Sequence, residues 1–173
     1  MTHPDIELLN TVYHAVPAVD LPKSGGGLAR FVDINDTQLA YGQIRNLTSA
    51  KTLSTSWQTL PLKDFIGEGC SKSNNGIAVT NSGIYIISGV VYLSTGFTTN
   101  DLVHIAAYIN NSNAFESYTR MNTANMYISA FLNPFIASLS ANDVVTLRAY
   151  NQGGNRGTAG ATVDMGLTLF QIR

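Results

Sequence analysis

The sequence predicts an all-β fold built from two antiparallel sheets, as a sandwich or a jelly roll. From about residue 50 onward, apolar and polar residues alternate with a period of two, and turn residues recur roughly every ten residues. No stretch carries the pattern of a long helix. About eight short strands without alternating helices favour two packed sheets over a parallel sheet with crossover helices.

Composition limits what this chain can do. Its 173 residues allow one domain with an appendage. Hydrophobic residues make up 45% and charged residues 12%, about half the usual charged share. The formal net charge is −1 and there is no basic run, so we expect neither a nucleic-acid partner nor an anionic membrane partner. A surface with so few charges suits contact with other protein subunits.

A single cysteine, Cys70, excludes an intrachain disulfide and an all-cysteine zinc site. The fold must therefore be stabilised by packing or by oligomerisation. The segment Met1–Leu9 lacks the basic and apolar regions of a secretory signal, and the apolar stretch Ile84–Leu93 is too short to span a bilayer. We expect a protein that matures inside a reducing cell and has no membrane partner.

Residues 1–50 are expected to form an extended N-terminal arm. Prolines at 4, 17 and 22 interrupt any long element, and three glycines at 25–27 form a joint. Residues 5–13 can make two helical turns, while 18–22 and 28–34 read as extended pieces. The arm cannot bury its apolar residues alone, so it needs its own domain, a neighbouring subunit or a partner to lie on. The arm residues expected to make that contact are Ile6, Leu9, Tyr13, Leu21, Leu28 and Phe31.

Residues 51–173 are expected to form the domain. The predicted strands are 52–60, 76–80, 84–93, 102–109, 114–119, 127–139, 144–150 and 162–172. Pro61 stops the first strand, and Asn81-Ser82-Gly83 makes the turn before the strongest one, which is rich in Ile, Val and Tyr. Asn133-Pro134 should break the strand over 127–139 or form a bulge in it. The glycine-rich segment Asn151–Gly160 joins the last two strands.

No nucleophile motif, phosphate loop or metal-ligand cluster is recognisable, so we expect neither an enzyme nor a bound cofactor. His104 has apolar neighbours and no evident Ser or Cys partner, which favours an ordinary strand histidine. Cys70 lies in the apparent loop 67–71, with no basic residue closer than Lys72 to activate it, which favours an inert side chain.

Two further patterns are candidate ligand sites. The segment Asn151–Gly157 resembles an anion-binding glycine loop, but no helix follows to supply aligned amides, so a strand connection is the default. Asp101, Asp143 and Asp164 can hold calcium only if their carboxylates converge, and sequence separation does not show whether they do.

Four motifs occur in a recognisable order. They are the Ser-Gly-Ile-Tyr-Ile-Ile-Ser-Gly run at 82–89, Tyr-Ile-Asn-Asn at 108–111, Leu-Ser-Ala-Asn-Asp-Val-Val at 139–145 and Met-Gly-Leu-Thr-Leu-Phe at 165–170. Together they resemble the jelly roll shared by tumour necrosis factor (TNF) and the globular heads of complement one-q. The similarity covers roughly residues 52–173. It departs from that pattern early in the last strand, where Val163 and Met165 replace the usual aromatic residue.

The resemblance implies a homotrimer, the typical state of this superfamily, with an aromatic face along the threefold axis. On that basis Tyr127 and Phe170 are expected at the subunit contact, where aromatic residues are favoured. Trp57, from the first strand, is a further candidate, although packing is the default role for that side chain. Similar domains occur in bacteriophage fibres and in capsid decoration proteins.

We therefore expect a virion structural protein: a trimeric capsid decoration, or cement, protein. It would be made in the host cytoplasm, sit on the capsid exterior, and use its arm to bind the major capsid protein or another virion protein. The alternative is the receptor-binding tip of a phage fibre or tail, with loops Gly96–Asn100 and Asn151–Gly160 recognising a host-surface glycan or protein. A third class, an enzyme acting on cell-surface polysaccharide, needs two convergent carboxylates, and this acid-poor sequence offers no obvious pair.

Overall fold

The computed structural model describes residues 39–46, 50–124, 127–159 and 165–172. Within these ranges the chain forms strands and no helix, and so no helix that could cross a membrane, which confirms the all-β prediction. The strands are β1 (Tyr41–Asn46), β2 (Lys51–Thr52), β3 (Gln58–Thr59), β4 (Asp64–Glu68), β5 (Cys70–Ser73), β6 (Gly76–Val79), β7 (Gly83–Leu93), β8 (Leu102–Ile109), β9 (Ser112–Arg120), β10 (Ile128–Leu139), β11 (Val144–Asn151), β12 (Thr158–Ala159) and β13 (Met165–Ile172).

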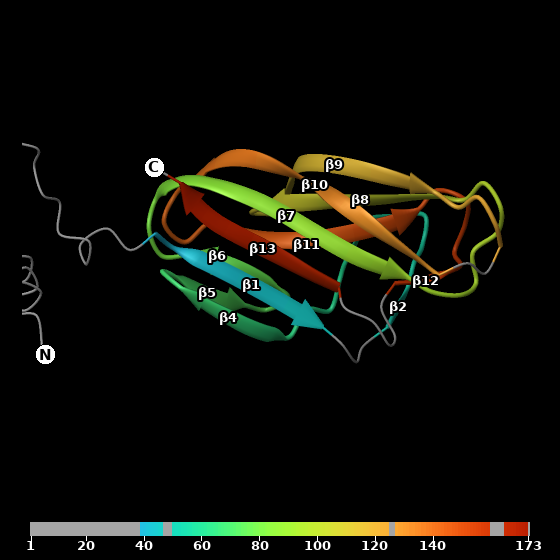
Figure 1. Cartoon of the computed structure of the whole chain (residues 1–173), viewed down its shortest axis with the longest axis horizontal. Helices are drawn as coiled ribbons and strands as arrows, with labels where there is room; N and C mark the ends of the chain where they lie inside the picture. Colours follow the sequence, from blue (N-terminus) through green and yellow to red (C-terminus); the bar gives the residue numbers. More distant parts are fainter. Residues whose placement is uncertain (1–38, 47–49, 125–126, 160–164, 173) are drawn as a thin grey trace, which may run out of the picture. The chain divides into compact units, whose positions relative to one another are not determined.

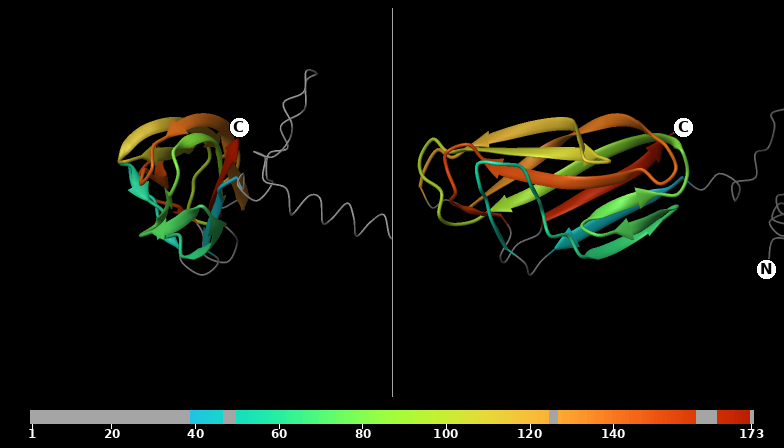
Figure 2. Two further views of the ribbon diagram at one scale, coloured as in Figure 1. Left: turned by 90° about the vertical axis from the view of Figure 1, so that its left-hand side faces the viewer. Right: turned by 180° about the vertical axis from the view of Figure 1, so that it is seen from behind.

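The strands form two antiparallel sheets that pack face to face, as the sequence predicts. The seven-stranded sheet has the order β2-β12-β7-β13-β1-β4, with β10 also paired to β7. The six-stranded sheet has the order β5-β6-β11-β8-β9, with β3 also paired to β11. Figure 1 looks onto the seven-stranded sheet, and the rear view in Figure 2 looks onto the six-stranded sheet.

Alternation along each strand builds the core between the sheets. In β11 the side chains of Val145, Leu147 and Ala149 are buried, while those at the intervening positions face outward. In β7 the buried set includes Tyr85 and Ile87, which point at the opposite sheet. Each fully buried aliphatic side chain contributes about 1.5–3 kcal/mol. The period-two pattern therefore determines which face of each strand joins the core.

The boundary between arm and domain lies earlier than the sequence analysis placed it. Tyr41–Asn46, expected in the arm, form β1 and pair with both β13 and β4. The compact unit accordingly begins at Leu39. The reason lies in the alternation of this short strand, in which Ile44 is fully buried and Tyr41 is exposed. The helical turns expected over 5–13, and all six apolar arm residues named above, lie outside the described residues.

Three segments differ from the predicted strands, and one of them is the expected connection 151–160, in which Thr158–Ala159 form β12. The single strand expected over 52–60 is instead β2 and β3, which belong to different sheets, so residues 53–57 cross from one sheet to the other. Strands β4 and β5 were not predicted, because β5 is polar and the pair is joined by Gly69 alone. Gly69 has a φ of +63°, and a Cβ there would lie 2.6 Å from that of Ala40. The bulge expected at Asn133-Pro134 is confirmed by a register shift between Leu132 and Phe135.

Candidate functional site

The outward face of the seven-stranded sheet carries most of the exposed apolar surface of the described residues. Eight large hydrophobic side chains are exposed among these residues. One of them, Tyr118, belongs to the six-stranded sheet, and the other seven lie on the outward face of the seven-stranded sheet. We call the other seven the association face: Tyr41, Ile66, Ile84, Tyr127, Phe131, Ile136 and Phe170. Three of them are about two-thirds exposed: Phe131 at 60%, Ile136 at 65% and Ile66 at 67%. Soluble monomers rarely leave large contiguous apolar patches in water, so this face is a candidate contact surface.

Strand register arranges these side chains in rows. Tyr41 of β1 is paired with Phe170 of β13, Phe170 with Ile86 of β7, and Ile86 with Ile136 of β10. Cross-strand partners share one face of a sheet, so these four form a continuous apolar row across four strands. Toward the other end, Phe131 is paired with Val90.

A shallow hollow of about 540 Å³ interrupts the face between the two apolar ends. Its floor includes Gly166, which has no side chain, and its rim includes Arg45, Val90 and Phe131. A polar row of Gln43, Thr168 and Ser88 runs through the same region, where Gln43 Nε2 donates to Thr168 Oγ1 at 3.2 Å. The face therefore combines protruding aromatic groups with a polar-floored recess, as specific contacts between subunits do.

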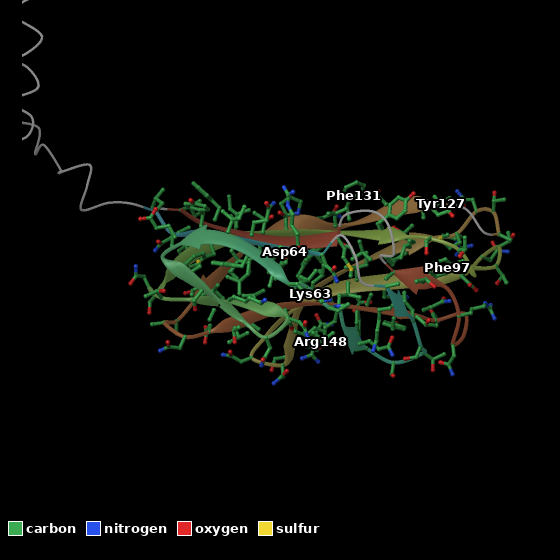
Figure 3. The ribbon with its side chains drawn as sticks, turned by 90° about the horizontal axis from the view of Figure 1, so that it is seen from below. Lys63, Asp64, Phe97, Tyr127, Phe131 and Arg148 are labelled. Atoms are coloured by element: carbon green, nitrogen blue, oxygen red, sulfur yellow. The ribbon has the colours of Figure 1, made fainter. Side chains whose placement is uncertain are left out.

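The structure places two of the three expected interface residues on this face, toward opposite ends of β7. Phe170 is 46% exposed, and Tyr127, which directly precedes β10, is 56% exposed and stacks on Tyr92 with ring centroids 5.9 Å apart. Trp57 is not with them. It lies in the crossing segment before β3 and packs against Tyr108 and Tyr150 of the six-stranded sheet. Figure 3 shows Tyr127 and Phe131 on one side of the sandwich and Arg148 of β11 on the opposite side.

A row of rings crosses the outer face of the six-stranded sheet; we call it the aromatic row. Trp57 meets Tyr108 and Tyr150 edge-on, with centroids 5.6 Å and 4.5 Å apart. His104 stacks on Tyr150 at 4.5 Å and lies 5.9 Å from Tyr118. Such pairs add about 0.5–1.5 kcal/mol each beyond burial. Burial raises the pKa of the Tyr108 and Tyr150 hydroxyls, so both stay protonated at neutral pH.

His104 is held on both ring nitrogens within this row. Its Nδ1 lies 2.5 Å from Glu116 Oε1, and its Nε2 lies 3.2 Å from Gln152 Oε1. Both contacts come from neighbouring side chains of the described strands and loop, which is the geometry of a tethered strand histidine. The prediction of an ordinary strand histidine agrees with these contacts.

The loops at one end of the sandwich are tied together by Asp101, which is 2% exposed. Arg156 donates to both carboxylate oxygens, from Nη2 at 2.7 Å and from Nε at 3.0 Å. Thr98 donates through its backbone N–H and its hydroxyl, both at 3.0 Å, and Asn151 Nδ2 donates at 3.2 Å. The bonds from Arg156, Asn151 and Thr98 hold the pKa of Asp101 well below its usual range against an opposing effect of burial. The glycine segment after Asn151 is thereby a braced connection between strands.

Cysteine and metal chemistry have little support in the described part of the chain. Cys70 begins β5, pairs with Val79 and is half-buried, and burial raises the pKa of its thiol to about 11. No group of three His, Cys, Asp or Glu side chains able to hold a metal ion occurs among the described residues. Asp101 is bonded to Arg156, whereas Asp143 accepts from Asn110 Nδ2 and the Ser140 N–H. Asp164 lies outside the described residues, so convergence of the three carboxylates stays untested.

Of the association face, sequence reasoning named Tyr127 and Phe170 and missed the other five members: Tyr41, Ile66, Ile84, Phe131 and Ile136. For Tyr41 the signal was present, because Tyr41–Asn46 alternate as a half-buried strand does. For Ile66 it was weak, since β4 mixes glycine with acidic residues. For Ile136 the bulge before it reverses which positions face outward, and that shift is not visible in the local pattern.

Comparisons with known proteins bear on the fold. No protein-family model matches the chain, and no curated protein sequence does. Among solved structures, murine APRIL matches with a TM-score of 0.56 and 13% identity, over 78% of this chain and all of that one. Eiger TNF from S. frugiperda matches with a TM-score of 0.51 and 12% identity, over 78% of this chain and 91% of that one. The domain therefore has the TNF-like jelly-roll fold that the sequence motifs predicted.

Proposed function

We propose that this protein is a virion structural protein without catalytic activity, a homotrimer that decorates the exterior of a capsid. Its copies associate through the association face, and residues 1–38 bind the major capsid protein or another virion protein. The anchoring segment is shorter than the arm of residues 1–50 expected from sequence, because Tyr41–Asn46 are part of the sheet.

The observation that carries the proposal is the exposed apolar face on one sheet only. Among the residues that the structure describes, seven large exposed hydrophobic side chains lie there, against Tyr118 on the other sheet. A copy of the same chain is the occupant that fits best, because proteins of the superfamily that the fold resembles are typically homotrimers. Burial of this face between copies also accounts for a sequence with few charges and no disulfide.

A trimer has a functional advantage in this setting. Three anchoring segments held on one body bind a shell together, so weak single contacts add up to durable attachment. The proposal places synthesis in the host cytoplasm, in accord with a fold that needs no disulfide.

The first test is the native mass of the full-length chain at micromolar concentration. We expect a mass of three chains for the natural protein and of one chain for the double variant Phe131→Asp and Ile136→Asp, which puts charges on the association face. Tyr118→Asp is the matched control, because it changes an equally exposed ring on the other sheet and should leave the trimer intact. A monomeric natural protein, or a double variant that stays trimeric, contradicts the proposal.

Shell attachment needs a separate test. Deleting residues 1–38 should leave a folded trimer that no longer co-sediments with assembled shells. Undiminished co-sedimentation after the deletion would exclude the anchoring role.

A receptor-binding tip is the second candidate, and one observation favours it. Asp101 braces the segments around Thr98 and Arg156 from below, so the loops at this end are held in shape before any ligand arrives. Preformed loops lose little entropy on binding. Replacing residues 96–100 should then abolish host adsorption and leave particle attachment unchanged.

A further inference from the structure

A second hollow, of about 760 Å³, lies away from the association face, where four segments meet. Thr59 and Lys63 come from the connection that contains β3, and Lys72, Asn74 and Asn75 come from the β5–β6 hairpin. The remaining walls come from the turn after β8 and from β11. We call this the cationic hollow; its lining residues are Thr59, Leu62, Lys63, Lys72, Asn74, Asn75, Asn111, Thr146 and Arg148.

Positive charge is concentrated in this hollow. Lys63, Lys72 and Arg148 are three of the seven Lys and Arg residues in the described ranges, and none of the nine lining residues is acidic. The whole chain has a formal net charge of −1, so a general excess of basic residues does not explain the clustering. In Figure 3 Lys63 and Arg148 both lie below Phe131 and Tyr127. A site of this kind attracts an oxyanion such as a carboxylate.

Arg148 is held in position before any ligand binds. Its Nη2 donates to Asn111 Oδ1, and its Cζ lies 4.1 Å from the centroid of the Tyr108 ring. An arginine fixed on an aromatic face loses little side-chain entropy when it binds an anion.

The walls of the hollow also hold unsatisfied polar atoms. Two buried side-chain atoms of the described residues lack a hydrogen-bond partner, Thr146 Oγ1 and Arg148 Nε, and both belong to lining residues of this hollow. Buried polar atoms in folded proteins are nearly always paired, so unpaired ones call for an explanation. Their occurrence in one place marks this wall as short of hydrogen-bond partners.

The remaining lining narrows the class of ligand. Leu62 is its single apolar residue, which disfavours an apolar ligand. Asn74, Asn75 and Asn111 offer amide donors and acceptors that match sugar hydroxyls, and the volume far exceeds what an inorganic ion fills. Through Arg148 the hollow adjoins the aromatic row, whose rings offer apolar surface of the sort on which sugar rings pack.

We propose that the cationic hollow binds an acidic saccharide, with Lys63, Lys72 and Arg148 holding its carboxylate and the asparagines its hydroxyls. This site is distinct from loops 96–100 and 151–160 considered above for receptor recognition. Saccharide binding at this hollow depends only on the fold and lining residues of one chain, so it does not require that copies associate or bind a shell. Decoration of a shell and adhesion to an acidic surface polysaccharide would then be two separate properties of the protein.

The protein contains its own reporter for the test. Trp57 is the only tryptophan and contacts Tyr108, the ring on which Arg148 rests. Its fluorescence should change when the hollow is occupied. The full-length chain is titrated with a panel of short oligosaccharides containing galacturonate, glucuronate or sialic acid, each alongside a neutral partner of equal length. Calorimetry gives the affinities independently.

We expect saturable binding of at least one acidic member and weaker binding of its neutral partner by about tenfold or more, since a charge-assisted hydrogen bond contributes about 1.5–3 kcal/mol. The double variant Lys63→Gln and Lys72→Gln should lose that preference. The control Lys51→Gln and Arg120→Gln removes the same charge outside the hollow and should bind within about twofold of the natural protein.

Several results would overturn the proposal. The first is that no acidic oligosaccharide binds. The second is that acidic and neutral partners bind equally well. The third is that the test and control variants lose the same amount of affinity. Displacement of the sugar by millimolar sulfate alone would show a small-ion site. Equal affinity for a single-stranded oligonucleotide of similar charge would show a general polyanion surface. None of these outcomes bears on the trimer or on shell attachment, so the two proposals fail separately.

Discussion

Replacing Asp101 with asparagine should destabilise the domain through the loops at one end of the sandwich. Asp101 is 2% exposed and receives five hydrogen bonds, two from Arg156, two from Thr98 and one from Asn151. The amide of an asparagine has one acceptor oxygen, and its NH₂ group would face donors of Arg156 or Thr98. The substitution therefore removes a charge and leaves at least one buried donor unpaired.

The expected loss of unfolding free energy follows from how deeply Asp101 and Arg156 are each buried. Breaking a buried ion pair by removing one partner costs about 3–5 kcal/mol. The Arg156 side chain is 41% exposed, so water hydrates the arginine that remains, and the loss should be nearer 2–3 kcal/mol. For a domain of this size that is a fall in melting temperature of about 10 °C.

The effect should depend on pH in one direction. The folded pKa of Asp101 lies below its unfolded value of about 3.9. A carboxyl group of this kind contributes its full stabilisation well above the unfolded pKa and loses it as the pH falls toward the folded pKa. The difference in stability between the natural protein and Asp101→Asn should therefore be largest near pH 7 and narrow below about pH 4.

Urea unfolding at a fixed protein concentration, at pH 7 and at pH 3, measures both effects. The control is Asp143→Asn, because Asp143 also accepts two hydrogen bonds, but in an exposed turn, and should cost about 1 kcal/mol or less. A cost for Asp101→Asn below about 0.5 kcal/mol at pH 7, or a difference that does not shrink at pH 3, would refute the assigned role of the buried carboxylate.

Two further predictions concern single residues. Gly157 has a φ of +79°, and a Cβ there would lie 2.2 Å from the buried ring of Phe97, so Gly157→Ala should cost about 2–4 kcal/mol by urea unfolding. Gly166→Ala should cost less, because Gly166 lies outside the positive-φ region and a Cβ there comes no closer than 3.2 Å to another atom. Burial raises the pKa of Cys70 to about 11, so iodoacetamide should alkylate it on the order of 100-fold more slowly than an exposed thiol at pH 7.5. Intact mass measures the extent of alkylation, and the difference in rate should vanish in urea. Fast labelling of the folded protein would contradict the burial of this thiol.

Much of the fold was predictable from local pattern. The period-two alternation in Val144–Asn151 and Gly83–Leu93 determines which side chains are buried, because successive residues of a strand face opposite sides. The bulge at Asn133-Pro134 was predictable because proline cannot donate to a sheet ladder. Strand β1 was also predictable from the alternation at Tyr41–Asn46. It was missed because the strand is short and directly follows the irregular arm.

The surfaces were less predictable, for a physical reason. The resemblance to a known fold predicted Phe170 and Tyr127 at the subunit contact, and both lie on the association face. Trp57, predicted with them, lies against the six-stranded sheet because residues 53–57 cross between the sheets. No local pattern reports such a crossing, since an extended segment has the same periodicity on either side of the sandwich.

The two polar clusters depend on contacts between residues distant in the chain. Asp101 and Arg156 are 55 positions apart, and the lining of the cationic hollow runs from Thr59 to Arg148. Alternation along β11 determines that Arg148 faces outward, a direction that the local pattern contains although the sequence analysis did not single out this residue. Whether Lys63 and Lys72 lie beside it depends on how the edge strands and their connections pack, because strand pairing, and not residue type, brings those segments together.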